Sequence, residues 1–379
     1  MTSTSNSSSS SGPGGAPAAS DKDRAAYEAL LAEARSIRGV SLWQDAWRRL
    51  KRNWAAHTSL YFLVVIGVLA LLTPALPLQS PVQQDLKNRK FGPPSLAPRA
   101  LGLSGHEAAD PIGALWHRPN FITRKLISLR LAVFGEWCVP SICGTDSLGR
   151  DILSRIFWGA RVSLTVGIIA TCVSLVIGVS YGATAGYLGG WADALMMRFV
   201  DILYSIPFIF VVIYLITVLS EPTTKKALEE LGVDQMMIFY LAIGAIYWLT
   251  MSRVVRGQVI SLKNEQFIEA ARTIGATRFR IIFRHLIPNV MGIVIVYLTL
   301  TIPAVMLFEA FLSFLGLGVT PPDVSWGLLV NEGLQVITPV KIYWWLVLFP
   351  SVALTATLFA LNFLGDGLRD ALDPRMKNK

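Results

Sequence analysis

The chain has 379 residues, of which 53% are hydrophobic and only 16% are charged. Soluble domains carry roughly 25% charged residues, and here the deficit falls into long uncharged runs, which is typical of a polytopic membrane protein. The net charge is +9. Because the basic residues flank apolar runs and form no stripe on a soluble scaffold, the charge argues against nucleic-acid binding.

Residues 1–40 predict a disordered to helical extension in front of the membrane domain. The first twenty residues are mostly Ser, Gly, Pro and Ala, a composition that cannot bury enough apolar surface to fold. The following stretch to Ile37 has helical composition. Because the N-terminus lacks an apolar core segment, it does not have the pattern of a secretory signal peptide.

Residues 41–57 predict an amphipathic helix that lies on the inner membrane surface. Trp43, Trp47 and Leu50 share one face at the spacing i, i+4, i+7. Basic residues accompany this face at Arg48, Arg49, Lys51 and Arg52. Aromatic and basic residues in this pattern favour the boundary between headgroups and acyl chains. A short soluble amphipathic helix is the alternative.

Six uncharged stretches follow, and they predict an all-α membrane protein with six transmembrane helices. They are residues 58–78, 162–192, 202–220, 235–252, 286–308 and 342–365. Each is long enough to cross a hydrocarbon core about 30 Å thick at about 1.5 Å per residue. The second exceeds one span and needs a turn near residues 186–190, and Pro207 is expected to kink the third. Continuously apolar runs argue against alternating barrel strands.

The basic flanks predict that both termini are cytoplasmic. The stretch between the fourth and fifth spans carries Arg253, Arg256, Lys263, Arg272, Arg278, Arg280 and Arg284. An even number of spans puts the N-terminal flank, this stretch and the C-terminal tail on one side. Since all three are basic, this side is expected to face the cytoplasm.

Residues 79–157 then form a long exterior loop, rich in proline near its start. Cys138 and Cys143 lie close together in it. A disulfide between them is expected if the loop faces an oxidising periplasm, and two unpaired thiols are the alternative. Asp146, Arg150 and Asp151 are expected to form salt bridges or loop hydrogen bonds rather than substrate contacts.

The stretch 265–289 predicts two short helices on the cytoplasmic side. The first runs to about Ile274, Gly275 takes the left-handed conformation that ends a helix, and Thr277 caps the second. Pro288 marks the start of the fifth span. Ala270 and Ala271 offer a small, flat surface that another protein can approach. The alternative is an interfacial hairpin that only anchors the loop.

Five ordered motifs carry a family resemblance. Glu269-Ala270-Ala271, Gly275 and Leu286-Ile287-Pro288 resemble the EAA loop of ATP-binding-cassette (ABC) importer permeases. Four further segments resemble the C-type permease of the dipeptide/oligopeptide/nickel group: Gly144–Leu164, Trp191–Pro207, Glu309–Gly327 and Asn362–Arg375. Together the motifs extend over most of the chain from Gly144 to Arg375.

The resemblance implies a type I ABC importer permease fold, with a five-helix core over residues 158–379. It implies that residues 265–289 couple the chain to an ATPase, through Glu269, Ala270, Ala271, Arg272, Gly275 and Pro288. The implied partners are a second homologous permease, giving a heterodimer, one or two cytoplasmic ATPase subunits and an extracytoplasmic binding protein. The implied setting is a bacterial inner membrane, crossed several times. Peptides are the expected substrate, with nickel chelates, glutathione and peptide-like antibiotics as alternatives, and the substrate-binding residues stay open.

Two other function classes fit the sequence less well. A proton-coupled carrier often buries ionisable residues in its spans, and the six runs contain none, although sodium coupling through backbone carbonyls stays open. An enzyme would need a cluster of reactive groups, whereas His57, His106, His117 and His285 are scattered. No phosphate-binding loop occurs, so ATP hydrolysis is expected on separate subunits, and no cofactor or metal is expected here.

Overall fold

The computed structural model describes residues 42–101, 111–116, 119–219, 221–230, 235–319 and 321–372. The expected N-terminal extension, residues 1–40, lies outside the described residues. The chain divides into two compact units, residues 1–45 and 46–379. Only the last residues of the first unit are described, so the account below concerns the second.

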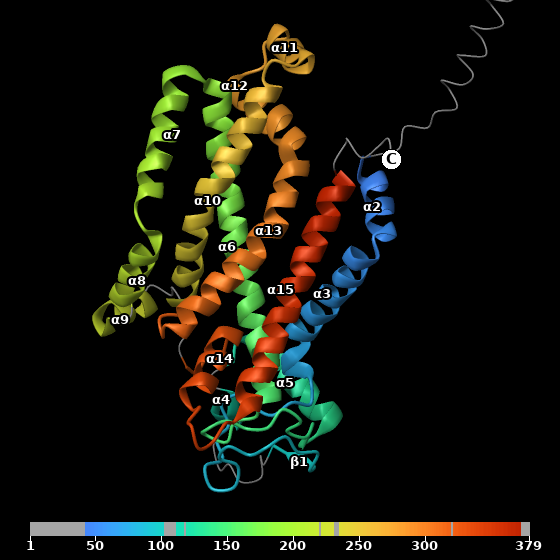
Figure 1. Cartoon of the computed structure of the whole chain (residues 1–379), viewed down its shortest axis with the longest axis vertical. Helices are drawn as coiled ribbons and strands as arrows, with labels where there is room; N and C mark the ends of the chain where they lie inside the picture. Colours follow the sequence, from blue (N-terminus) through green and yellow to red (C-terminus); the bar gives the residue numbers. More distant parts are fainter. Residues whose placement is uncertain are drawn as a thin grey trace, which may run out of the picture. The chain divides into compact units, whose positions relative to one another are not determined.

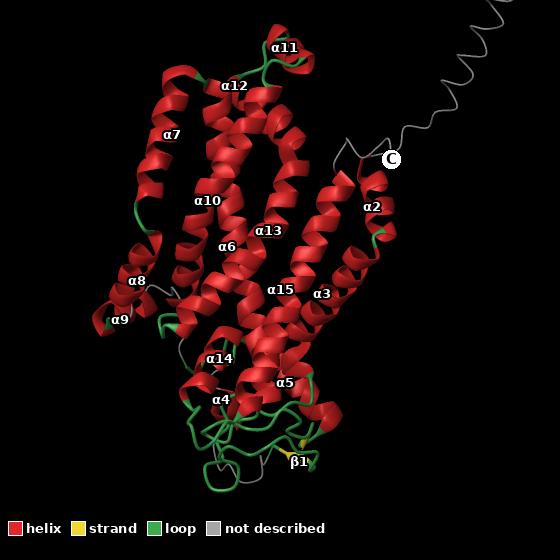
Figure 2. Ribbon diagram, in the orientation of Figure 1, coloured by secondary structure: helices red, strands yellow, loops and turns green. Residues whose placement is uncertain are grey.

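Helices make up the membrane domain (Figure 2). Among the described residues, five helices are long and apolar enough to cross a membrane: α3 (Trp54–Leu72), α6 (Ile152–Leu188), α10 (Gln235–Leu262), α13 (Ile287–Phe314) and α15 (Trp344–Leu372). Helices α7 (Gly190–Ser205) and α8 (Phe208–Leu219) follow one another with a bend of 74°. Counted as one broken span, this pair completes the six predicted crossings (Figure 1).

Local backbone rules account for both breaks around α7. The turn from α6 to α7 lies at Gly189 and Gly190, whose φ angles of 64° and 54° are in the left-handed region that favours glycine. The break between α7 and α8 follows Ile206, which is extended with ψ of 124° ahead of Pro207. The predicted turn and the predicted kink are confirmed.

The first span begins earlier than the uncharged run suggested. Helix α2 (Leu42–Arg52) ends one residue before Asn53, whose side chain accepts a hydrogen bond from the backbone N–H of Ala56 and caps α3. On α2, Leu50 is buried against Ala56 and Ala371. Trp47 is 48% exposed instead, so these two residues do not share one environment as the spacing suggested.

A loop-rich cap lies at the end of the bundle opposite α2 and α11 (Figure 1). It includes η1 (Thr73–Ala75), α4 (Pro111–Trp116), α5 (Phe121–Phe134) and the antiparallel pair β1 (Arg99–Ala100) and β2 (Trp137–Cys138). The short helices α9 (Pro222–Glu230) and α14 (Trp326–Gln335) precede spans α10 and α15. Cys138 and Cys143 are buried, unbridged thiols in the structure, so their pairing stays a prediction.

The centre of the domain is the contact between α6 and α10. Gly178, Gly182 and Gly186 recur every fourth residue on α6 and face α10. A Cβ on Gly178 would lie 2.6 Å from the Cβ of Met251, and one on Gly182 would overlap the backbone of Ser252. Small residues at this spacing let two helix backbones approach closely, which is how membrane helices gain packing energy in the absence of a hydrophobic driving force.

Candidate functional site

The candidate site is the stretch Glu265–Asn289, hereafter the coupling segment. It consists of α11 (Gln266–Thr273), α12 (Arg278–Arg280) and η3, a π-helical stretch (Ile281–Leu286). It joins α10 to α13 at the end of the bundle where α6 and α10 terminate (Figure 1). The sequence places a hairpin here, and the structure has one.

Three residues determine the turn of this hairpin. Gly275 has a φ of 81°, and the N–H of Ala276 reaches back to the carbonyl of Ala271 at 3.0 Å, which satisfies one of the last helical carbonyls. Thr277 then begins the second helix, and its side chain accepts a hydrogen bond from the N–H of Arg280 at 3.3 Å. Both assignments made from the sequence are confirmed.

One face of the hairpin is buried against the spans. Ile268 and Ala271 of α11 and Ile281, Ile282 and Leu286 of η3 belong to the same apolar cluster as Val255 and Val259 of α10 and Ala183 of α6. Ala271 is only 4% exposed. The prediction that two alanines form a flat exposed surface is therefore wrong. Ala271 faces inward together with Ile268, one helical turn away, and of the two alanines only Ala270 is exposed.

The opposite face presents apolar and basic side chains. Ile274 is 87% exposed and Phe279 is 70% exposed, and the Phe279 ring lies 4.3 Å from that of Phe283. Around them Glu269, Arg272, Arg278, Arg280 and Arg284 are exposed. Sequence reasoning missed Ile274 and Phe279. The sequence did contain a signal: these two large apolar residues flank the turn at Gly275, at positions that do not match the spacing of the buried residues in either helix.

The coupling segment is attached to three spans. It continues from η3 into α13 without a break, and Pro288 stands exposed in the first turn of α13. The guanidinium of Arg272 lies 5.4 Å from the ring centre of Tyr187, at the end of α6. Lys263, just after α10, donates to the carbonyl of Gly186 at 3.2 Å. The hairpin is thereby tied to α6, α10 and α13 by contacts or by the chain itself.

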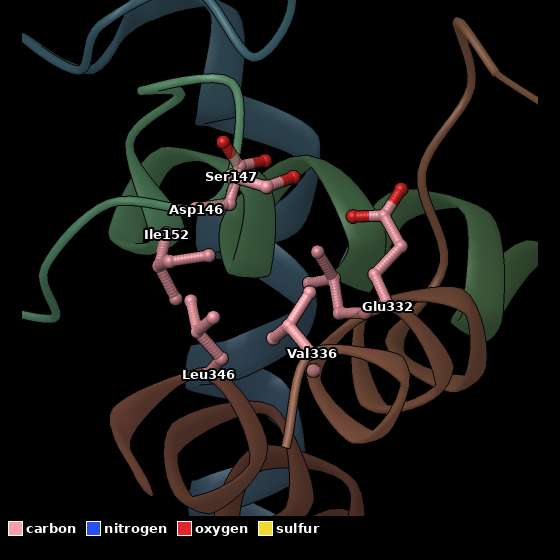
Figure 3. A pocket seen from close by; sticks show the side chains of 8 residues that line it. Asp146, Ser147, Ile152, Glu332, Val336 and Leu346 are labelled. Carbon is pink, nitrogen blue, oxygen red and sulfur yellow. The ribbon is translucent and has the colours of Figure 1, made fainter. Parts of the chain in front are cut away.

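A charged cluster lies at the other end of α6. Arg155 is 1% exposed and contacts Asp146 at 2.8 Å and Glu332 of α14 at 2.5 Å. Arg150 contacts the same two carboxylates at 2.6 Å and 3.2 Å. Asp146, Ser147 and Glu332 border a cavity of about 10 Å³, which holds one water at most (Figure 3). These ionic groups neutralise one another, as the sequence reasoning expected for Asp146 and Arg150.

Charged residues also occur within the helices that form the spans, which corrects the prediction that the spans carry none. Arg256 of α10 makes two hydrogen bonds to Asp193 of α7, at 2.5 Å and 2.7 Å. Glu309, fully buried in α13, accepts a hydrogen bond from Ser313 at 2.8 Å. The helices run beyond the uncharged stretches because each of these charges has a partner on its own or a neighbouring helix.

Comparisons with known proteins agree on one family. The sequence profile described as the binding-protein-dependent transport system inner membrane component matches residues 178–378, and that of the N-terminal transmembrane domain of oligopeptide transport permease C matches residues 41–98. The chain is 40% identical to the dipeptide transport system permease protein DppC of Bacillus subtilis, over 91% of this chain and 90% of that protein. It is also 40% identical to the oligopeptide transport system permease proteins OppC of Haemophilus influenzae, over 90% of this chain and 92% of the relative, and of Escherichia coli, over 91% and 95%.

Proposed function

This chain belongs to the family of binding-protein-dependent transport inner membrane components, and on that premise we propose that it is a permease subunit importing di- and oligopeptides. Its relatives carry dipeptide and oligopeptide transport in their names, which puts peptides ahead of nickel chelates, glutathione and peptide-like antibiotics. The chain is a multi-pass protein of the inner membrane, and the part of it that the structure describes has five to six helices long and apolar enough to cross. It acts as a transporter subunit and not as an enzyme.

The observation that carries the proposal is the two-sided character of the coupling segment. One side is anchored in the apolar cluster shared with α6 and α10. The other side exposes Ile274 and Phe279 among arginines. Phenylalanine and arginine are enriched in protein interfaces, and exposed apolar patches rimmed by polar residues mark interaction sites. Such a surface suits a groove on a cytoplasmic ATPase subunit, with Glu269, Ala270 and Arg272 at the contact.

The remaining partners follow from the same assignment. A second, homologous permease encloses the path together with this chain, and an extracytoplasmic binding protein delivers the peptide to the loop-rich cap. ATP binding closes the ATPase pair and displaces the coupling segment, and α6, α10 and α13 follow because they share its buried cluster. The bundle thereby alternates between outward and inward access.

The proposal is tested in proteoliposomes that contain this chain, its second permease and the ATPases, with the binding protein added outside. We expect uptake of a radiolabelled dipeptide that requires both ATP and the ATPase subunits. Uptake that persists without either of them would instead identify a secondary carrier and overturn the proposal.

Substitutions in the coupling segment give the first specific prediction. Gly275→Val puts a β-branched residue at a φ of 81°, in open space, so the substitution strains the turn without a steric clash. Glu269→Lys reverses an exposed charge. Both are expected to lower uptake about tenfold or more, because about 1.4 kcal/mol of lost coupling suffices for tenfold. The amount of chain in the membrane should not change.

The matched control is Glu230→Lys, which makes the same reversal at an exposed position on α9, away from the coupling segment. The control should co-purify with the ATPase subunits as the wild type does, whereas Glu269→Lys should not. If both coupling variants associated normally with the ATPase subunits and took up peptide normally, the proposal that the coupling segment contacts the ATPase would be disproved.

A further inference from the structure

Helix α7 has three faces of different character. Asp193 and Val200 are buried toward the neighbouring helices. Leu195, Phe199 and Ile202 are 55%, 50% and 56% exposed and form an apolar stripe. A second exposed stripe, about a quarter turn away, is polar and contains Arg198, Asp201 and Ser205. α7 lies at the edge of the bundle beside α10 (Figure 1). A membrane helix with two exposed faces of opposite polarity meets two different environments.

The polar stripe is joined to α10 by an exposed ion pair. Arg253 contacts Asp201 at 2.7 Å, and their side chains are 43% and 57% exposed. The Arg253 guanidinium also lies 4.4 Å from the ring centre of Tyr204, and the Tyr204 hydroxyl is 3.3 Å from that of Thr250. Hereafter Asp201, Tyr204, Thr250 and Arg253 are called the α7–α10 polar face.

Lipid does not suit this face. Charged side chains in membrane-spanning segments turn to a protein interior or to a water-filled cavity, because hydrocarbon offers them no hydrogen bonds. The apolar stripe of Leu195, Phe199 and Ile202 already gives α7 a lipid-facing side. The α7–α10 polar face is therefore left for an aqueous path or for a second subunit.

We propose that the α7–α10 polar face lines the translocation path, and that Arg253 and Asp201 receive the charged termini of the passing peptide; this rests on the function proposed above. The guanidinium presents paired N–H donors that match the two oxygens of an α-carboxylate. The Asp201 carboxylate accepts from an α-ammonium group. When the path is empty, the two residues neutralise each other.

This chemistry fits peptides of any sequence. Every unmodified peptide carries one ammonium and one carboxylate at its ends, whatever its side chains. A site in which the two peptide termini replace an internal ion pair recognises peptides as a class. Selection among different peptides is then left to other parts of the transporter. The Tyr204 ring beside Arg253 adds an apolar surface for side chains without imposing a shape.

The same two helices provide a matched control pair. Arg256 and Asp193 are also bridged, but by two hydrogen bonds, and Asp193 is buried. Their side-chain exposures are 35% and 13%. This second pair holds α7 to α10 and is not available to a ligand on the Asp193 side.

The first experiment measures access from water. In a Cys172→Ser background, which removes the exposed native thiol, Ser205→Cys and Ile202→Cys are treated with a charged, membrane-impermeant methanethiosulfonate in the reconstituted complex. We expect Ser205→Cys to react and to lose uptake on modification, and Ile202→Cys to stay unmodified. An unreactive Ser205→Cys would overturn the proposal and place the face against a second subunit or in lipid. Equal reaction at both sites would also overturn it, because the two stripes would then not differ in their access to water.

The second experiment measures transport. Arg253→Gln and Asp201→Asn are expected to lower peptide uptake per ATP hydrolysed by about tenfold at saturating loaded binding protein, with the melting temperature of the complex unchanged. Asp193→Asn should lower the melting temperature instead. If the exposed pair had only a structural role, both variants would lose stability and keep normal uptake per ATP hydrolysed. That result would refute the proposal.

The two levels of inference fail differently. A wild-type complex that imports no peptide disproves the proposed function, whatever the labelling pattern. A complex that imports peptide, while Arg253→Gln and Asp201→Asn behave as the wild type, leaves that function standing and disproves only the role of the α7–α10 polar face.

Discussion

A buried carboxylate caps the N-terminal end of α6. Asp151 is 2% exposed, and its Oδ2 accepts a hydrogen bond from the N–H of Ser154 at 2.7 Å. Burial raises the pKa of Asp151 from the ordinary value of 3.8 to about 6, and the Ser154 bond opposes this only in part. Because the folded-state pKa is the higher one, the stability gained by protonation is present below about pH 4. It is lost as the pH rises through about 6.

Asp151→Asn tests this titration. Asparagine is as good a helix cap as aspartate and carries no charge. We expect the melting temperature of the wild type to fall more between pH 4 and pH 7 than that of the variant. At pH 7 the variant should be more stable, by about 1–3 kcal/mol. Thermal unfolding of the purified protein across this range measures both. A variant less stable than the wild type at pH 7 would contradict the assignment.

At the residue scale, backbone rules were predictable and side-chain environments were not. Gly275, Thr277 and Pro207 act on the chain next to them, so their turn, cap and break follow from residue type alone. The burial of Ala271 and the exposure of Ile274 depend on which face of α11 meets α10. The buried face of α11 is determined by residues that are distant in the sequence, so it could not be predicted from the sequence of α11 alone.

At the scale of elements, the close contact between α6 and α10 leaves little room for substitution. Gly178, Gly182 and Gly186 leave no room for a side chain toward α10. Their spacing is visible in the sequence, but the sequence of one helix does not show which partner that helix approaches. The helix bounds were misjudged for a related reason. Arg155 and Arg256 lie beyond the ends of the uncharged runs but inside helices, where carboxylates of other elements neutralise them.

Gly182→Val is therefore expected to separate α6 from α10. The new Cβ would overlap the backbone of Ser252, which cannot move aside as a flexible side chain can. Overpacking of this kind costs about 1–3 kcal/mol or more. The measured result should be a lower melting temperature and little folded protein in the membrane. Gly67→Ala in α3 is the control, since nothing lies within 4 Å of its Cβ position, and it should behave as the wild type. Equal melting temperatures for the two variants would refute the close contact.

At the scale of the whole molecule, five sequence motifs were enough to predict the family. No motif predicted which residues line the translocation path. In the proposed function a second permease encloses part of the path, and the residues that it contributes belong to another sequence. Orientation also rests on charge: α2, the coupling segment and the C-terminal end of α15 lie at one end of the bundle, and the basic flanks predict that this end is cytoplasmic.

Reporter fusions check this orientation. A green fluorescent protein at the C-terminus should fluoresce, because it folds in the cytoplasm. Alkaline phosphatase inserted after Lys226, an exposed residue of α9, should be active, because it needs the oxidising exterior. Active phosphatase at the C-terminus, with none after Lys226, would invert the topology and move the coupling segment away from any cytoplasmic ATPase.

The length of α6 has a consequence for how the two surfaces of the membrane communicate. Its 37 residues measure about 55 Å, well beyond a hydrocarbon core of about 30 Å. One end carries Arg155 of the charged cluster with Asp146 and Glu332, and the other carries Tyr187 beside Arg272. If a helix of this length rotates by about 5° around one of its ends, the other end moves by about 5 Å. We therefore expect binding at the end of α6 that carries Arg155 to alter binding at the coupling segment, and reciprocity then requires that binding at the coupling segment alter binding at the Arg155 end to the same extent.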